Sequence, residues 1–413
     1  MKKNINKNIF YALDIGSRKM TLAAAATDAS GALSPVLIET QKSVGIFKGV
    51  VNDLVSLSDA VSQLFKKMEV RLGAKASHVA LSINGNYINA RHSQAAVALS
   101  DRGTRSITRR DIEKLNAQAR TLGMELDEQL LHEYPQGYSI DRHNMTLNPI
   151  GLHGRRFDVD MLLVCANTGY VENIARAVEQ AGLDVANVVF SGVAASEAVL
   201  SDEEKEKGVV LVDIGDALTS VLIFKDGVVR SVSVLSFGGK NLSEIIANYC
   251  SVPLETADKI KETSLEVGHD IPETEEVMIK IEYAYKPVKK QDLSRVCQPE
   301  IDRFIAMLKG VIFESKDISL QPAMPVVVIG GLSQLEGLLE KMEHDLGLSV
   351  NMGLAKGLGD ISPTKASAYA SALGLLYLRK DYHLGAALKL KAQGKNKLAK
   401  ALDYVTNLYQ DYF

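Results

Sequence analysis

One pattern occurs twice in the chain and constrains its fold more than any other feature: an apolar run, an Asp-Ile-Gly turn and a second apolar run. The copies are FYALDIGSRKMTLAAA and VVLVDIGDALTSVLIF, in which the aspartates are Asp14 and Asp213. An ordinary hairpin places Asn-Gly or Asp-Gly between its strands, whereas these acids lie at the strand end. We therefore expect a ligand at the strand ends, and two similar lobes that present equivalent loops to it.

Strand-like and helix-like runs alternate along the rest of the chain, which is typical of an α/β fold. The run HVALSI at 78–83 predicts a strand, and SLSDAVSQLFKKMEVRLG predicts an amphipathic helix that Gly73 ends. The charged run SDEEKEKG at 201–208 is interpreted as a loop that marks the boundary between the two halves.

The pattern of expected strands and helices changes over residues 84–165. Strand-like runs there flank a helix that Thr108 begins, with Asp111 three positions on, as in a capping box. We interpret this segment as a subdomain inserted into the first half.

Composition excludes several classes of protein. The 413 residues carry a formal net charge of −3, so the chain as a whole does not attract nucleic acid or an anionic membrane. The three cysteines, Cys165, Cys250 and Cys297, lie too far apart for a disulfide framework or a CxxC metal site. No apolar run is long enough for a signal peptide or a membrane span. These features predict a cytosolic protein that is neither exported nor inserted.

The two turns have the chemistry of a phosphate site. Gly16 and Gly215 let the backbone turn its N–H groups toward an anion, Ser17 and Thr219 offer hydroxyl groups, and Lys19 offers a positive charge.

The two aspartates suit a different part of the same ligand. Carboxylates do not bind phosphate directly, but Asp14 and Asp213 could hold Mg²⁺ through water, because that ion dehydrates reluctantly. In MPVVVIGGLSQLEGLLEKM, Gly330 and Gly331 separate a buried strand from a helix, where the backbone could approach a flat nucleoside. Each turn alone is more often structural, but the three in this order favour a nucleotide site.

At these positions the chain resembles the actin-like ATPases, and within them the FtsA family of bacterial cell-division proteins. The resemblance covers nearly the whole length, and the stretches PQGYSID and NPIGLHG carry its most specific part because they belong to the FtsA-type insertion. It is carried by DIGSRK, LHEYPQGYSIDRHNMTLNPIGLHGRRFDVDMLLV, AVEQAGLDVANVVFSGVAASEAVL as the helix joining the lobes, VDIGDALTSVLIF and VVVIGGLSQLEGL.

The resemblance implies a two-lobed actin-like fold with ATP between the lobes and a relocated subdomain. Its parts would be subdomain 1A at 1–83 and 166–206, the inserted subdomain 1C at 84–165, subdomain 2A at 207–240 and 301–384, subdomain 2B at 241–300, and a basic linker with an amphipathic membrane-targeting helix at 385–413.

The resemblance also implies a set of residues that bind ATP and Mg²⁺. Asp14 and Asp213 would hold the metal through water. The cofactor-binding residues would be Asp14, Gly16, Ser17, Arg18, Lys19, Asp213, Gly215, Asp216, Thr219, Gly239, Lys261, Gly330, Gly331 and Ser333.

The second phosphate loop departs from the family pattern. Gly-Gly-Gly-Thr is replaced by a loop with Asp216, Ala217 and Leu218, whose Asp-x-Gly-Asp-x-x-Thr spacing is similar to that of actin. Ser191 and Gly192 stand where heat-shock chaperones and MreB carry a glutamate that orients water. We expect ATP binding with at most slow Mg²⁺-dependent hydrolysis, because phosphoryl transfer needs a positioned water.

The C-terminus carries a second functional signal. A lysine-bearing stretch precedes KLAKALDYVTNLYQDYF, whose bulky apolar and basic residues suit a helix in the headgroup region of an anionic leaflet. Packing of this helix against the body of the protein is the alternative. Its apolar face is formed by Leu398, Leu402, Val405, Leu408, Tyr409, Tyr412 and Phe413.

The resemblance implies an ATP-binding, filament-forming protein at the cytoplasmic face of the cell membrane at the division site. Its partners would be the C-terminal peptide of FtsZ through 2B and 2A, later division proteins through 1C, other copies of itself and the anionic membrane surface, but no nucleic acid. Three other classes stay open: a sugar-kinase-like enzyme, for which no catalytic base is found, a PilM-like pilus-assembly adaptor and a nucleotide-independent scaffold.

Overall fold

The computed structural model describes residues 9–27, 33–100, 103–143, 145–268, 272, 274–281, 284–313, 324–356, 362 and 366–378. All of them belong to one compact unit. The predicted membrane helix and its linker at 385–413 lie outside the described residues. In the part of the chain that is described, no helix is both long and apolar enough to span a bilayer.

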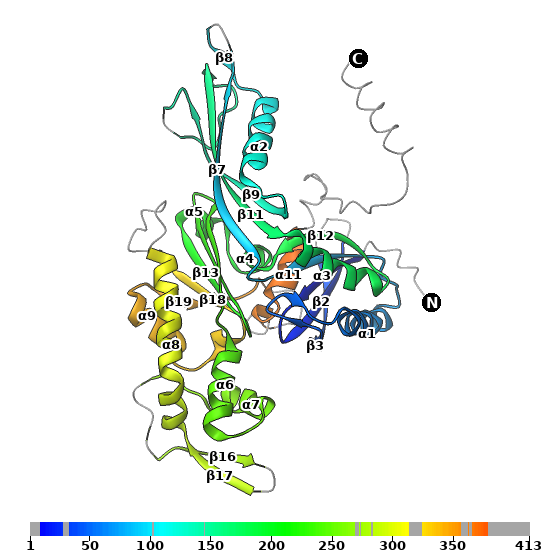
Figure 1. The fold of residues 1–413 in the computed structure, drawn as a ribbon, viewed down its shortest axis with the longest axis vertical. Helices are drawn as coiled ribbons and strands as arrows, with labels where there is room; N and C mark the ends of the chain where they lie inside the picture. Colours follow the sequence, from blue (N-terminus) through cyan, green and yellow to red (C-terminus); the bar gives the residue numbers. More distant parts are fainter. Residues whose placement is uncertain are drawn as a thin grey trace. The chain divides into compact units, whose positions relative to one another are not determined.

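The first lobe is built on a five-stranded sheet with the order β12-β6-β1-β2-β3 (Figure 1). Strands β1 and β2 are antiparallel, and β6 is parallel to both β1 and β12. The predicted helix ends as expected, since Gly73 adopts a left-handed conformation (φ 66°) that caps it. The elements are β1 (Ile9–Ile15), β2 (Lys19–Thr27), β3 (Leu33–Lys42), β4 (Ile46–Phe47), β5 (Val50–Val51), α1 (Leu54–Leu72), β6 (His78–Ile83), α3 (Thr168–Gln180) and β12 (Asp184–Phe190).

The segment between β6 and α3 forms a separate three-stranded antiparallel sheet with the order β7-β11-β9. Helix α2 packs on β7 and β11, as Figure 1 shows, and the predicted capping box between Thr108 and Asp111 is present. The elements are β7 (Ile88–Ala98), β8 (Arg105–Ser106), α2 (Arg109–Gly123), β9 (Glu128–Ile140), β10 (His153–Gly154) and β11 (Arg156–Asn167). We call residues 84–165 the insert.

The second lobe repeats the first. Its five-stranded sheet has the order β15-β14-β13-β18-β19, with β13 antiparallel to β14 and parallel to β18. Asp14 pairs with Thr21 in the first sheet and Asp213 pairs with Ser220 in the second, so the two aspartates occupy equivalent positions.

The remaining elements of this half include a two-stranded sheet, β16-β17. They are β13 (Val209–Ile214), β14 (Thr219–Lys225), β15 (Val228–Leu235), α6 (Gly239–Cys250), α7 (Leu254–Ser264), β16 (Glu276–Ile281), β17 (Ala284–Lys289), α8 (Lys290–Phe313), β18 (Val326–Ile329), the 3₁₀ helix η1 (Gly331–Gln334), α9 (Leu338–Leu346) and β19 (Val350–Met352).

Two helices connect the lobes: α4 (Ser191–Val199) and α11 (Ala370–Tyr377). They pack against each other, α11 contacts strands of the first sheet, and α4 contacts strands of both sheets. Their composition is almost entirely small or apolar, which lets them come close together.

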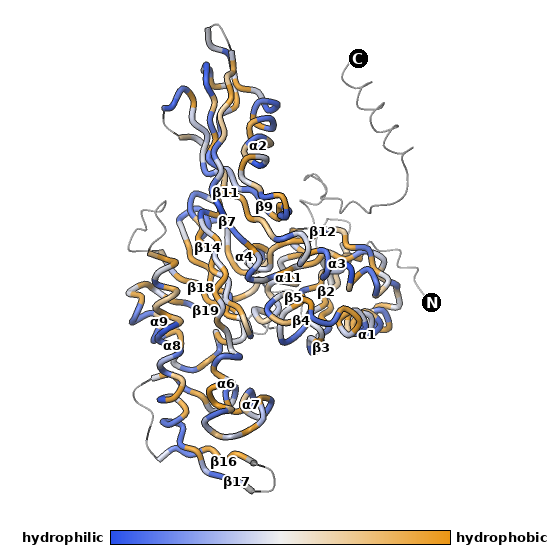
Figure 2. The backbone as a smooth tube through the Cα atoms, in the orientation of Figure 1, coloured by the Kyte–Doolittle hydropathy of each residue, from blue (hydrophilic) through white to orange (hydrophobic). Residues whose placement is uncertain are grey.

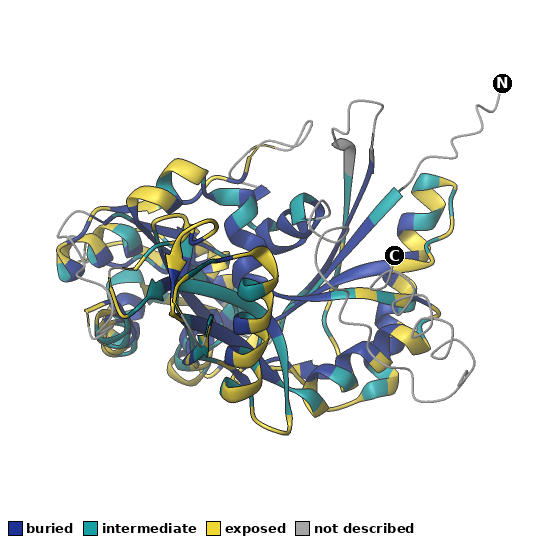
Figure 3. Cartoon of the chain, turned by 90° about the horizontal axis from the view of Figure 1, so that it is seen from above, coloured by how far each residue is buried: buried dark blue, intermediate teal, exposed yellow. Residues whose placement is uncertain are grey.

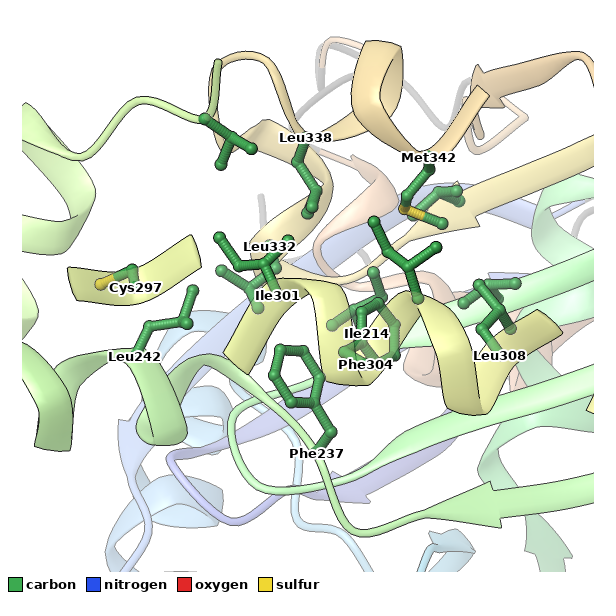
Figure 4. Packing of buried hydrophobic residues seen from close by; sticks show 14 of the residues in the cluster. Ile214, Phe237, Leu242, Cys297, Ile301, Phe304, Leu308, Leu332, Leu338 and Met342 are labelled. Atoms are coloured by element: carbon green, nitrogen blue, oxygen red, sulfur yellow. The ribbon is translucent and has the colours of Figure 1, made fainter. Parts of the chain in front are cut away.

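The strands supply the core of each lobe. Figure 2 shows the apolar residues concentrated along the central strands, and Figure 3 shows these strands largely buried beneath helices with exposed outer faces. In the second lobe Phe237 stacks on Phe304 of α8 with ring centroids 4.1 Å apart, at the centre of the cluster in Figure 4. Such aromatic pairs contribute stability beyond the area they bury.

Two sequence-based expectations need correction. The run at 201–208 contains a helix, α5 (Asp202–Lys207), because Ser201 and Glu204 form a capping box and Glu203 pairs with Lys207 one turn on. The stretch AVEQAGLDVANVVFSGVAASEAVL is not a single connecting helix either, since it contains the end of α3, all of β12 and α4.

Candidate functional site

A cleft of about 740 Å³ lies at the ends of β1 and β13, where the two Asp-Ile-Gly turns face the connecting helices. This volume is ordinary for a small-molecule site. Twelve of the fourteen residues expected to bind a cofactor line it: Asp14, Gly16, Ser17, Arg18, Lys19, Asp213, Gly215, Asp216, Gly239, Lys261, Gly330 and Gly331.

The other two expected residues, Thr219 and Ser333, are not brought into the lining. Thr219 is fully buried, and its hydroxyl donates to the carbonyl of Phe237 at 2.9 Å. Ser333 donates to the carbonyl of Gly330 at 2.8 Å. Both hydroxyls therefore stabilise loops that frame the cleft.

The two turns have the same backbone geometry. Gly16 N–H donates to the carbonyl of Lys19 at 3.1 Å, and Gly215 N–H donates to the carbonyl of Leu218 at 2.9 Å. A Cβ on either glycine would come 3.0 Å from that same carbonyl oxygen. Close backbone approach thus favours glycine in both turns, and the backbone there forms an open cradle toward the cleft.

Two further glycine elements close around the second turn. Gly330 has φ +90°, and a Cβ there would lie 2.3 Å from the carbonyl oxygen of Ile214 and 2.7 Å from Oδ1 of Asp213. At the start of α6, Gly239 N–H donates to the carbonyl of Gly215 at 3.0 Å. The N-terminal end of α6, with its partial positive charge, is thereby fixed beside this turn.

Negative charge is costly on both of the aspartates predicted to hold the metal. Oδ1 of Asp14 accepts a hydrogen bond from the Ser82 hydroxyl at 2.6 Å. Desolvation raises the pKa of Asp14 despite this bond. Desolvation, followed by the charge of Asp14, raises the pKa of Asp213 to about 7. A hydrated divalent cation would relieve both effects, so this pair fits the predicted Mg²⁺.

The positive side chains at the cleft are already engaged with protein groups. The ammonium group of Lys19 donates to the carbonyl of Ala368 at 3.1 Å and lies 4.5 Å from the ring centroid of Tyr369. Lys261 is only 5% exposed and donates to the carbonyl of Gly239 at 2.9 Å. The guanidinium of Arg18 pairs with Glu262 of α7 at 2.6 Å, which joins the two lobes across the cleft.

Sequence reasoning missed the polar atoms in the cleft that have no partner. Among the described residues, Oδ1 of Asn84 and Oγ of Ser191 are buried without a hydrogen bond. Asn84 is the first residue of the insert and directly follows β6, which is parallel to β1. Its side-chain amide donates to the hydroxyl of Ser220 in the second lobe at 2.8 Å. Its place just after a central strand is the signal that could have identified it. Such orphaned atoms fit a site that takes a polar ligand.

Leu218, one of the residues by which the second loop departs from the family pattern, lies in the wall of the cleft and is 5% exposed. The glycine cradle, the acid pair and the orphaned polar atoms together fit a magnesium-bound polyphosphate better than an apolar ligand.

Without nucleotide and Mg²⁺, we expect the contribution of Asp213 to the stability of the protein to fall as the pH rises from 3.8 to about 7. Across this window the folded chain keeps a proton on Asp213 that the unfolded chain has lost, so each rise in pH favours unfolding. The side chain of the variant Asp213→Asn stays neutral, so the melting temperature of this variant should depend less on pH. Thermal unfolding between pH 4 and 8 measures this. A wild-type melting temperature that rose relative to the variant across the window would contradict it.

The fold and the site together define an actin-like protein: two lobes of like topology, each contributing an Asp-Ile-Gly turn to one cleft. Residues 210–374 match the family model for cell division protein FtsA, and residues 85–165 match the model for the SHS2 domain inserted in FtsA. The chain belongs to the FtsA family.

Curated relatives support this assignment over nearly the full length. The chain is 29% identical over 370 residues to the cell division protein FtsA of Pseudomonas aeruginosa, which covers 88% of this chain and 87% of that one. It is 26% identical over 394 residues to FtsA of Escherichia coli K12, with 93% of each chain covered. It is 26% identical over 406 residues to FtsA of Borreliella burgdorferi, with 96% and 98% covered.

Solved structures share the fold. The PilM-PilN type IV pilus biogenesis complex matches with a TM-score of 0.62 and 18% identity, covering 89% of this chain and 98% of that one. MreB5 of Spiroplasma citri bound to ADP matches with a TM-score of 0.52 and 11% identity, and the match covers 92% of this chain and 99% of that one. The chain in a MamK double helical filament matches with a TM-score of 0.52 and 11% identity, covering 90% and 98%.

Proposed function

We propose that this chain is an ATP-binding, filament-forming division protein that tethers the FtsZ ring to the cytoplasmic face of the cell membrane and recruits later division proteins. The observation that carries the proposal is the pair of equivalent Asp-Ile-Gly turns that frame one cleft in a chain of the FtsA family.

In this proposal the backbone of the two turns and of Gly330-Gly331 cradles the nucleotide. Asp14 and Asp213 hold Mg²⁺ through its water ligands, and the ion neutralises phosphate charge and fixes the phosphate geometry. Lys19 adds a positive charge beside the first turn. Three loops thus converge on one anion from different parts of the chain, which suits a ligand that holds the lobes together.

Hydrolysis is proposed to be slow. The start of α4 offers only the hydroxyl of Ser191 at the cleft, which cannot act as a general base of useful strength. The nearest acid along that helix, Glu197, is paired with Lys205 at 2.6 Å. We therefore assign the nucleotide a mainly structural role, in which binding stabilises the closed arrangement needed for polymerisation.

The partners are assigned by part of the chain. The FtsZ C-terminal peptide would bind the region 241–300 with the adjacent second lobe (207–240 and 301–384), and later division proteins would bind 84–165. The first lobe would comprise 1–83 and 166–206. Residues 385–413 would attach the protein to the anionic inner leaflet, and filament formation would strengthen a weak single anchor through multivalency.

Deletion of 395–413 is the test of the attachment. We expect the full chain with Mg·ATP to sediment with vesicles of anionic phospholipid and to retain a labelled FtsZ C-terminal peptide, because the tail supplies bulky apolar and basic groups. The truncated chain should stay in the supernatant and still bind the peptide. Equal sedimentation of the two chains would contradict the anchor, and absence of ATP-dependent assembly would favour a nucleotide-independent scaffold.

A further inference from the structure

One strand of the insert contacts both lobes. Strand β9 contacts β12, an edge strand of the first five-stranded sheet, and β15, an edge strand of the second. The insert has its own sheet and its own core, and its strands β7 and β11 also contact β15. Contact with both lobes through the same strand makes β9 sensitive to any change in their separation.

The contact with the first lobe reaches the wall of the cleft. Nε2 of His132 on β9 accepts a hydrogen bond from the N–H of Phe190 at 3.0 Å. Phe190 is fully buried and precedes α4, and its apolar side chain cannot cap that helix. The next residue, Ser191, lines the cleft. His132 therefore fixes the point where α4 begins.

The state of the imidazole suits this role. Desolvation lowers the pKa of His132 to about 4, so the ring is neutral near physiological pH and Nε2 has a free lone pair for the Phe190 N–H.

The contact with the second lobe is made four residues further along the same strand. The side-chain amide of Gln136 donates to the carbonyl of Val229 on β15 at 2.9 Å. In return the guanidinium of Arg230 donates to the backbone carbonyl of Gln136 at 2.9 Å. Arg230 is itself held by Asp226 at 2.6 Å. These bonds fix the orientation of Gln136 on the second lobe.

Two β-bulges lie at these same points of β9. In the pairing of β9 with β11, Gln136 has no partner residue, although its neighbours Pro135 and Gly137 are paired. Leu131 likewise has no partner residue, although Leu130 and His132 are paired. A bulge bends its strand and re-aims the neighbouring side chains. The irregularities thus coincide with the residues that reach the two lobes.

We propose that β9 couples the insert to the nucleotide cleft, with His132 as a positioning residue for the start of α4 and Gln136 as the link to the second lobe. If nucleotide changes the separation of the lobes, a strand fixed to both must tilt or lose one contact. By thermodynamic reciprocity, a partner bound to the insert then changes nucleotide affinity by the same factor as nucleotide changes affinity for that partner. This coupling rests on the proposed binding of ATP.

Hydrogen exchange of the full chain, with and without Mg²⁺ and a non-hydrolysable ATP analogue, tests the coupling. In the wild type we expect the analogue to change exchange in the cleft turns and, by about fivefold, in β9, the low end of typical coupling. In Gln136→Leu the cleft should still respond and the change in β9 should shrink, because the side-chain amide bond to Val229 is lost while the bond from Arg230 to the backbone carbonyl of position 136 remains. Gln94→Leu, the same replacement on an exposed position of β7, should behave as the wild type.

The histidine is tested by rescue. His132→Leu removes the acceptor for the Phe190 N–H and should weaken binding of the analogue about fivefold or more. His132→Gln keeps an acceptor and should restore most of the affinity, which a purely structural requirement for a ring would not allow.

The outcomes separate the two proposals. A response in the cleft without one in β9 of the wild type overturns the coupling and leaves ATP binding intact. Equal affinity of the His132→Leu and wild-type chains overturns the role of His132. No response in the cleft of the wild type overturns ATP binding, and the coupling with it.

Discussion

We expect replacement of Asp14 by alanine to lower the affinity for Mg·ATP by about 100-fold, the upper end of the loss typical when an outer-shell group of a metal site is removed. Asp14 is one of the two acids that fit hydrated Mg²⁺, and desolvation raises its pKa even though the ammonium group of Lys19 is nearby. The replacement also leaves the hydroxyl of Ser82 without its acceptor. The dissociation constant of a fluorescent ATP analogue in excess Mg²⁺ measures the effect.

Metal dependence distinguishes this role from a general disturbance of the cleft. In excess EDTA the wild type should lose affinity and approach the Asp14→Ala variant, because neither then has the ion. Asp59→Ala, at an exposed position of α1, serves as the matched control and should bind as the wild type. An affinity of Asp14→Ala within threefold of the wild type in Mg²⁺ would show that the acid pair does not serve the cation.

The parts of the site that sequence could predict are those fixed by short-range backbone chemistry. A single copy of the motif is enough to predict a tight turn that contains glycine, with an acid at the end of the preceding strand. The second copy locates the partner because equivalent strands place Asp14 and Asp213 at equivalent points of two like sheets. Local pattern and duplication thus placed both turns at one cleft, whereas many of the other lining residues had no signal in the sequence.

What the sequence could not predict depends on contacts between distant segments. Nothing near Arg18 indicates that its guanidinium pairs with Glu262 across the cleft. Likewise, Thr219 has the right spacing for a phosphate contact, but the carbonyl of Phe237 engages its hydroxyl inside the protein. The polarity of the run at 201–208 predicts a loop, but the capping box of Ser201 and Glu204 begins helix α5 there.

The helices that connect the lobes give the second large effect, at Gly374. In an isolated helix, Gly→Ala would stabilise by about 1 kcal/mol through helix propensity. A Cβ on Gly374 of α11, however, would lie 1.6 Å from the carbonyl oxygen of Ala194 in α4, which no rotamer change can relieve. The helices must separate, and overpacking of this kind costs about 3 kcal/mol. The net effect of Gly374→Ala is therefore destabilising.

Thermal unfolding of Gly374→Ala beside Gly169→Ala tests this. Gly169 lies in the first turn of α3, where a Cβ would meet only Oδ1 of Asn167 at 3.4 Å, so propensity should dominate and the melting temperature should hold or rise. For Gly374→Ala we expect it to fall by several degrees. Because α4 begins at the cleft with Ser191, the surviving folded fraction should also bind nucleotide less tightly. A melting temperature of Gly374→Ala at or above the wild-type value would mean that the lobes separate without cost, and that the close crossing of α4 and α11 does not hold them together.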